Sequence, residues 1–168
     1  AELANLDGFR KFNSSVLTMA DGIITVNCHG EYPGILATND NCIATINHYY
    51  YVSTTAKVEA GIKYYAPYFD EEVLGINVTA IGTGDFVRSC IIRKAIIPGS
   101  AAIGSRIVTT NGGYYEGMLQ MKQPVFIDLT LLFGPGNEPT DTSDPRIAQI
   151  EAYAAAHPDY NAGELVSA

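Results

Sequence analysis

Turn residues and alternating apolar runs divide the whole chain into short segments. Clusters of glycine, proline and asparagine recur roughly every 8–12 residues, and apolar and polar residues alternate between them with a period of two. Successive side chains of a strand point to opposite faces, so this alternation predicts a sheet protein. Helix signals are nearly absent before residue 143. We predict strands at residues 22–28, 34–38, 42–46, 49–58, 62–69, 74–81, 86–97, 102–110, 114–122 and 125–132.

The strand predicted at residues 49–58 shows the alternation most clearly. Tyr50, Val52, Thr54, Ala56 and Val58 share one face, and Tyr49, Tyr51, Ser53, Thr55 and Lys57 share the other. We expect one face to lie in the core and the other in solvent.

Two turn signals connect the later strands. Asn111, Gly112 and Gly113 tolerate positive φ and join two alternating runs, which predicts a β-hairpin. Pro124 lies directly before the apolar run at residue 125, which predicts a tight crossing from one sheet to the other. About ten antiparallel strands in one domain indicate two packed sheets.

One helix is predicted near the C-terminus. Ser143 or Asp144 can cap it, Pro145 suits its first position, and His157 before Pro158 ends it. Apolar residues then recur every three to four positions, at Ile147, Ile150 and Tyr153 or Ala154. We therefore expect a β-sandwich at residues 1–142, and a helix and tail at 143–168 that pack on the sandwich or on a neighbour.

Size and charge exclude several classes of protein. A chain of 168 residues and 18.1 kDa fits one domain. The net charge is −8 with only ten Lys and Arg, so we expect no nucleic-acid partner. Apolar runs fall far short of the roughly 20 residues of a spanning helix, and the N-terminus has no visible export signal, so we expect no membrane insertion.

The three cysteines match no metal-binding spacing. Cys28, Cys42 and Cys90 all lie in apolar, strand-like segments, which favours buried reduced thiols. A disulfide between Cys28 and Cys42 is the alternative.

No catalytic constellation is visible. The three histidines are scattered, no serine-nucleophile elbow is present, and the glycines of "AIGTGDF" and "FGPGNEP" do not open a helix after a parallel strand. We expect no enzyme and no cofactor. Asp70, Glu71 and Glu72 could bind a structural calcium ion, but a solvated hairpin tip accounts for them better.

The segment "FIDLTLLFGPGNEPT" resembles a sequence of known proteins. It is similar to a "DLT, then Phe-Gly-x-Gly-Asn-Glu-Pro" segment in tail, baseplate and fibre-associated proteins of bacteriophages, at the end of jelly-roll domains like carbohydrate-binding modules. Pro135 departs from that pattern, where a small or charged residue is usual. The Tyr-rich segment at 47–58 and the helix and tail from residue 144 are similar more loosely. The resemblance implies a jelly-roll β-sandwich in a phage particle.

The same segment also has a purely structural interpretation, in which it binds no ligand or metal. Val125, Ile127, Leu129 and Leu131 would bury one face, and glycines would supply special backbone angles. We expect a loop that closes the end of the sandwich, formed by Phe133, Gly134, Gly136, Asn137, Glu138 and Pro139.

Eleven tyrosines are the remaining signal, since about half of those on strands must point away from the core. Exposed tyrosines suit sugar stacking or a protein interface. We take as ligand or interface candidates Tyr49, Tyr51, Tyr114 and Glu116.

Two functions remain open. The first is a non-enzymatic virion component that contacts other virion proteins and copies of itself. The second is a carbohydrate-binding adhesin that recognises a cell-surface glycan. A secreted or cell-surface module of a cell has support only from the sequons at Asn13 and Asn77.

Overall fold

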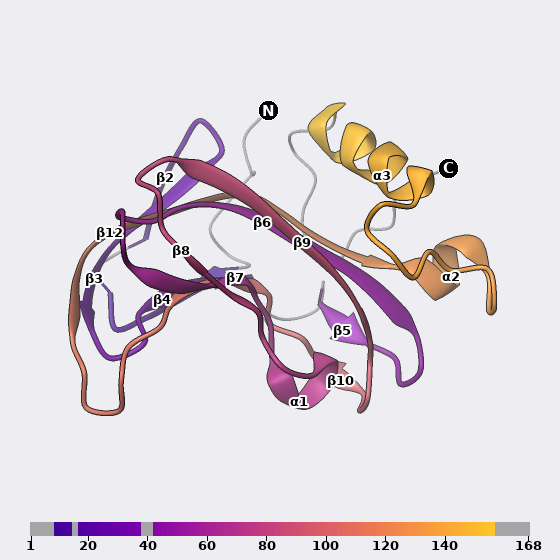
Figure 1. Cartoon of the computed structure of the whole chain (residues 1–168), viewed down its shortest axis with the longest axis horizontal. Coiled ribbons are helices and arrows are strands. Elements are labelled where there is room, and N and C mark those ends of the chain that lie inside the picture. The colour runs from indigo at the N-terminus through magenta and orange to yellow at the C-terminus, as the bar shows by residue number, and fades with distance from the viewer. Residues whose placement is uncertain (1–8, 15–16, 38–41, 157–168) are drawn as a thin grey trace.

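The protein is a sandwich of two five-stranded antiparallel sheets, with three helices outside it (Figure 1). The computed structural model describes residues 9–14, 17–37 and 42–156. Sheet A contains, in spatial order, β1 (Phe9–Phe12), β4 (Gly34–Ala37), β11 (Gly104–Ile107), β7 (Lys63–Tyr68) and β8 (Thr79–Ile81). Sheet B contains β2 (Thr18–Ala20), β3 (Ile23–Gly30), β12 (Tyr115–Asp128), β6 (Tyr49–Lys57) and β9 (Phe86–Lys94). A small ribbon pairs β5 (Ile43–Ala44) with β10 (Gly99–Ser100). The predicted jelly-roll β-sandwich is confirmed.

The core has two layers. Two clusters fill the space between the sheets, one around Leu119 and Ile107 and the other around Phe126 and Phe69. A third cluster lies on the outer face of sheet B, under the C-terminal helix α3 (Pro145–Ala156). Figure 1 shows α3 lying over β6 and β9, outside the sandwich. Sheet B is therefore covered on both faces over part of its area.

This second layer corrects the prediction for β6. Tyr50 and Val52 point into the sandwich, as expected, but Tyr51 and Ser53 on the other face are also buried. Helix α3 covers them, so that part of the face expected in solvent forms a core of its own.

β12 is one strand where two were predicted. Lys122 pairs with Thr55 and Val125 with Ser53, so β12 carries one extra residue at this point. Gln123 has a φ of 51°, and the bulge also accommodates Pro124. The bulge reverses the alternation: Val125 and Ile127 turn to α3, while Phe126 enters the sandwich. The predicted crossing between sheets at Pro124 is wrong.

The turn at residues 111–113 forms without the predicted hairpin. Gly113 N donates to Thr110 O at 2.7 Å, and Gly112 has a φ of 75°. However, β11 before the turn pairs with β4 and β7, while β12 after it pairs with β3 and β6. The turn therefore leads from sheet A to sheet B.

Two short helices form where none was predicted, one in the expected hairpin tip at Asp70–Glu72 and one at the end of the strand predicted at residues 125–132. Helix α1 (Glu71–Leu74) is capped by Asp70, whose Oδ1 accepts a hydrogen bond from Glu72 N at 2.9 Å. Helix α2 (Leu129–Phe133) is capped by Asp128, whose Oδ1 accepts from Leu131 N at 2.8 Å. Leu131, expected in a buried face, is 62% exposed as a result.

Helix α3 begins where it was predicted. Pro145 is its first residue, and Asp144 Oδ1 accepts from Arg146 N at 2.9 Å. Ile147, Ile150 and Ala154 are buried against sheet B. The predicted helix end at His157 lies outside the described residues.

A polar cluster fixes α3 to the sheet. Glu151 accepts hydrogen bonds from the Tyr51 hydroxyl, from Ser53 Oγ at 3.0 Å and from Arg88 Nε at 2.9 Å. Burial and the neighbouring Glu151 carboxylate raise the pKa of Tyr51, which keeps its hydroxyl a donor.

The cysteines carry no disulfide. Cys28 and Cys42 are buried free thiols in different halves of the core, and Cys90 is exposed on β9, contrary to expectation. No helix among the described residues is long and apolar enough to cross a membrane.

Candidate functional site: a tyrosine-lined groove

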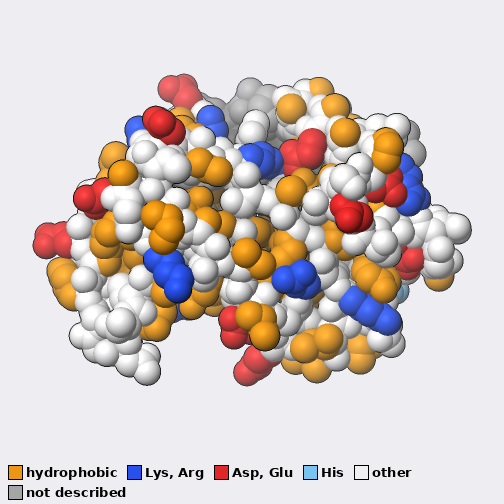
Figure 2. Space-filling model, in the orientation of Figure 1, with side chains coloured by type: hydrophobic (Ala, Val, Ile, Leu, Met, Phe, Trp, Pro, Cys, Tyr) orange, Lys and Arg blue, Asp and Glu red, His pale blue; other side chains and the backbone are white. Residues whose placement is uncertain are grey.

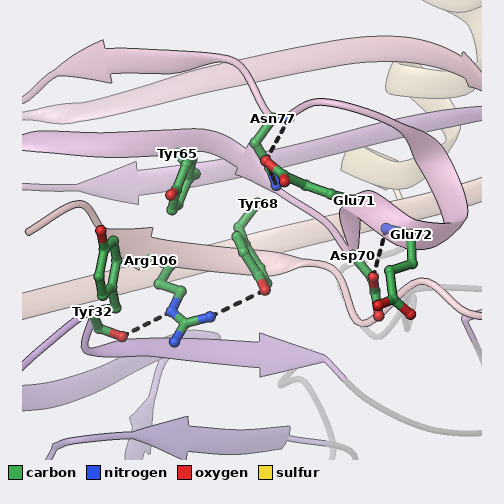
Figure 3. A pocket seen from close by; sticks show the side chains of 8 residues that line it. All are labelled: Tyr32, Tyr65, Tyr68, Asp70, Glu71, Glu72, Asn77 and Arg106. Carbon is green, nitrogen blue, oxygen red and sulfur yellow. Dashed lines mark hydrogen bonds between the residues drawn. The ribbon is translucent and has the colours of Figure 1, made fainter. Parts of the chain in front are cut away.

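A groove of about 480 Å³ lies on the outer face of sheet A (Figure 3). Its walls come from β7, β11, the loop after β3 and the start of α1. It is lined by Tyr32, Tyr65, Tyr68, Asp70, Glu71, Glu72, Asn77 and Arg106.

The strand register places the groove residues on one face. Ile107 pairs with Tyr64, and both belong to the core between the sheets. Their neighbours Arg106 and Tyr65, which also pair, therefore point outward. The next pair is Gly104 with Tyr68, so β7 has one extra residue between Tyr65 and Tyr68. This bulge brings two tyrosines three positions apart into the same groove.

Arg106 holds the tyrosines in place. Its Nε donates to the carbonyl of Tyr32 at 2.8 Å, and its Nη1 donates to the Tyr68 hydroxyl at 3.2 Å. Its guanidinium carbon lies 5.7 Å from the Tyr32 ring centroid and 5.3 Å from that of Tyr68, within the range of a cation–π contact. Figure 3 shows Arg106 between the two rings.

The backbone around Arg106 also supports this arrangement. Gly34 lies opposite Arg106 on β4, and a Cβ at Gly34 would approach the Ser105 carbonyl oxygen to 2.6 Å and Arg106 Cα to 3.0 Å. Tyr32 has a φ of 45°, and Thr109 Oγ1 accepts a hydrogen bond from its backbone N at 3.1 Å. Tyr32 is thus fixed from two sides.

Tyr65 completes the aromatic wall. Its ring centroid lies 5.5 Å from that of Tyr68, with an interplanar angle of 51°. Burial raises the pKa of Tyr65, and Tyr32 and Glu71 raise it further. The hydroxyl therefore stays protonated and can donate a hydrogen bond to a ligand.

Acidic side chains form the other end of the groove. Asp70 caps α1, and Glu71 Oε1 accepts from Asn77 N and Nδ2 at 3.3 Å each. Glu72 is exposed at the mouth. Within the described residues, no three His, Cys, Asp or Glu side chains lie close enough to hold a metal ion. Asp70, Glu71 and Glu72 form the cap and first turn of α1, where a hairpin tip was expected.

The four ligand candidates from the sequence lie elsewhere and apart. Tyr51 is 1% exposed under α3, and Tyr49 is half-buried with Lys94 Nζ 5.7 Å from its ring centroid. Tyr114 is 66% exposed and Glu116 is also exposed, at the opposite end of β12. Glu116 is itself on β12, where it pairs with His29, and Tyr51 pairs with Ile127 of the same strand. Glu116 and Ile127 are about 35 Å apart along β12, at about 3.3 Å per residue.

The structural-loop residues surround a hydrogen-bonded network. Thr130 Oγ1 accepts from Tyr49 N at 2.9 Å and donates to Glu138 Oε1 at 2.8 Å. Asp128 Oδ2 lies 2.7 Å from His48 Nδ1 and accepts from the Tyr50 hydroxyl at 3.0 Å. The two segments that carried the sequence resemblance therefore meet in space.

The rest of the loop packs beside α3. Phe133 packs against the apolar cluster under α3, and its ring centroid lies 4.9 Å from the Arg146 guanidinium carbon. Gly134 and Gly136 have φ values of 90° and 83°, which glycine adopts readily and other residues rarely adopt. The Asn137 carbonyl accepts from Arg146, and Pro139 is buried. Backbone amides and Thr130 lower the pKa of Glu138.

The main groove residues were missed as a site. Tyr65 and Tyr68 stood in the sequence among other tyrosines, and a strict period of two places them on opposite faces. Only the bulge in β7 brings them together with Arg106, and no residue pattern in the sequence predicts that bulge.

Comparison with solved structures fits this fold. A CBM4 carbohydrate-binding module matches with a TM-score of 0.51 and 9% identity, covering 70% of this chain and 90% of that one. The N-terminal cellulose-binding domain of Cellulomonas fimi β-1,4-glucanase C matches with a TM-score of 0.53 and 11% identity, covering 72% and 88%. The chain has the β-sandwich fold of carbohydrate-binding modules.

A phage structure also matches, more distantly. The enzymatically active domain of bacteriophage CBA120 tailspike protein 4 has a TM-score of 0.46 and 12% identity, and 19% of that chain is covered. No protein-family model and no curated protein sequence matches the chain.

Proposed function

We propose that this chain is a non-catalytic glycan-binding module and that the groove on sheet A is its binding site. The observation that carries this proposal is the set of three tyrosine rings that line the groove on an outer sheet face, two of them in contact with Arg106. The groove volume of about 480 Å³ falls within the usual range for ligand sites.

The chemistry of the groove suits a sugar. A tyrosine ring offers an apolar face on which the C–H face of a pyranose can pack, and its hydroxyl can hydrogen-bond a sugar hydroxyl. Tyr65 and Tyr68 present such faces at a tilt of 51°, so successive sugar units can contact successive rings. Because Arg106 already fixes two of the rings, little side-chain entropy is lost when a ligand binds.

Removal of the aromatic wall tests this proposal. The double variant Tyr65→Ala, Tyr68→Ala is expected to bind glycans at least about 30-fold more weakly, since each lost stacking contact is worth about 1 kcal/mol or more. A glycan array, followed by calorimetry on the best ligand, measures the change. Tyr114→Ala is the matched control, because Tyr114 is 66% exposed outside the groove.

The outcomes separate the two locations. Loss of binding in Tyr114→Ala, with the double variant unaffected, would place the site on sheet B and contradict the proposal. Far-UV circular dichroism and a thermal melt of each variant show whether the fold is retained.

We propose the biological setting on the basis of the sequence resemblance. The segment from Asp128 to Thr140 is similar to phage tail, baseplate and fibre-associated proteins, which supports a module that attaches a virion to a host glycan. The location that we propose is the particle surface. A secreted or cell-surface module is the alternative.

A second candidate is a virion subunit that acts through protein contacts. Hydrophobic side chains gather along the lower rim of the face in Figure 2, near α1, β5 and β10. Exposed large side chains in these segments and the adjoining loops are Ile43, Ile46, Ile76, Ile96 and Ile97. Such a patch is typical of a contact surface.

Solution mass tests this second candidate. We expect light scattering to show an assembly of several copies, and the double variant Ile96→Ser, Ile97→Ser to shift it to the 18.1 kDa monomer, because polar side chains weaken an apolar contact. Val87→Ser on β9 is a control of similar chemistry, since Val87 is exposed outside those segments. A wild-type chain that stays monomeric at high concentration would count against self-assembly through this rim.

A further inference from the structure

We infer that the groove selects glycans by charge: it accepts chains of uncharged sugars and rejects polyanionic ones, with Glu72 as the residue that sets this discrimination. The inference rests on the proposed function, since it concerns the ligand of the same groove.

The groove carries a surplus of negative charge. Asp70, Glu71 and Glu72 are consecutive at one end, and Arg106 is the one cation among the lining residues that the structure describes. Three carboxylates against one guanidinium leave a balance of −2 in the groove. The whole chain adds to the same sign, with a net charge of −8. An approaching polyanion therefore meets repulsion both at long range and in the groove.

Arg106 is oriented by the tyrosines. Its guanidinium donates to the Tyr32 carbonyl and the Tyr68 hydroxyl and stacks between their rings. The presence of an arginine in the groove is thus explained by the tyrosine wall and does not indicate an acidic sugar.

The fold accounts for two of the acids but not for the third. Asp70 caps α1, and Glu71 accepts hydrogen bonds from Asn77, whose side chain in turn binds the backbone of Phe69. These partners are neutral amides, so the charges on both acids persist. The Glu72 carboxylate makes no hydrogen bond or ion pair with any other described residue, and it lines the groove (Figure 3). Its charge therefore faces the ligand space.

Backbone-matched glycans test the inference. Each pair joins a neutral polymer to the uronate that differs only by oxidation at C6: β-1,4-glucan with β-1,4-polyglucuronate, and β-1,4-mannan with β-1,4-polymannuronate. At about 10 mM salt, where the Debye length is about 30 Å, we expect the uronate of the bound pair to bind at least about tenfold more weakly. At about 1 M salt, where the Debye length is about 3 Å, the two affinities should converge.

Two charge reversals locate the effect. Glu72→Lys should raise the ratio of uronate affinity to neutral-chain affinity roughly tenfold at low salt. Glu116→Lys changes the net charge by the same amount from an exposed position on sheet B, and it should have a much smaller effect.

The outcomes are distinguishable. A uronate that binds as tightly as its neutral partner, or equal effects of the two reversals, would overturn charge selection in the groove while leaving glycan binding intact. If the wild-type chain bound no member of any pair and no glycan on an array, the proposed function itself would fail and this inference with it.

Discussion

Asp128→Ala is expected to lower the free energy of unfolding by about 3–4 kcal/mol, as the sum of a lost helix cap and a buried hydroxyl left without its acceptor. Asp128 Oδ1 caps α2 through Leu131 N, and its Oδ2 accepts from Tyr50 and contacts His48. Tyr50 is 1% exposed and stacks on Phe126 at 4.7 Å between centroids, so its hydroxyl cannot turn to water. Urea unfolding followed by circular dichroism measures the change.

Asp128→Asn divides this effect into its parts. Asparagine is a good helix cap, but its amide removes the charge and one acceptor oxygen. We expect a loss of about 1–2 kcal/mol, mainly from the contacts to Tyr50 and His48. If both substitutions cost less than about 0.5 kcal/mol, the network between the two resemblance-bearing segments would not contribute to stability.

Glu151→Ala is expected to lower the free energy of unfolding by about 2–3 kcal/mol. It removes the partner of Arg88 and the acceptor of Tyr51 and Ser53, whose hydroxyls are buried beneath α3. Breaking a fully buried pair costs about 3–5 kcal/mol, and this one is discounted because its side chains are 27% and 29% exposed.

Two controls sharpen the Glu151 experiment. Glu151→Gln keeps an acceptor for the hydroxyls and should lose about half as much stability, while Gln149→Ala on the exposed side of α3 should be nearly neutral. Limited proteolysis should cut the α3 segment of Glu151→Ala faster than that of the wild type. Equal cleavage rates would mean that the apolar contacts of Ile147 and Ile150 alone hold the helix.

The fold class followed from local patterns in the sequence, because alternation and capping act over a few residues. The alternation at Tyr49–Lys57 gave β6, and Asp144 with Pro145 gave the start of α3. The same reasoning failed where the partner lies far away in sequence. The turn at residues 111–113 formed, but its two arms pair with strands of different sheets. A turn residue constrains its own backbone and not the choice of a pairing strand.

The site was missed for a related reason. A period of two assumes uninterrupted strands, and each bulge reverses which side chains face the core. Because of the bulge at Gln123, Val125 faces α3. Because of the bulge in β7, Tyr68 lies on the same face as Tyr65. Burial of Tyr51 was equally hidden, since it depends on a helix that packs on β6 from one hundred positions further along the chain.

The groove and α3 lie on the outer faces of opposite sheets, and this arrangement affects how many copies can act together. If a copy is attached to a larger particle through its α3 side, its groove faces away from that particle. If the groove binds a glycan as proposed, neighbouring copies held in this way can bind one long polysaccharide at several points without obstructing each other. Linking sites in this manner raises avidity by about 10²–10⁴ over a single site. An individual groove of only millimolar affinity would then be sufficient for firm, yet reversible, adhesion.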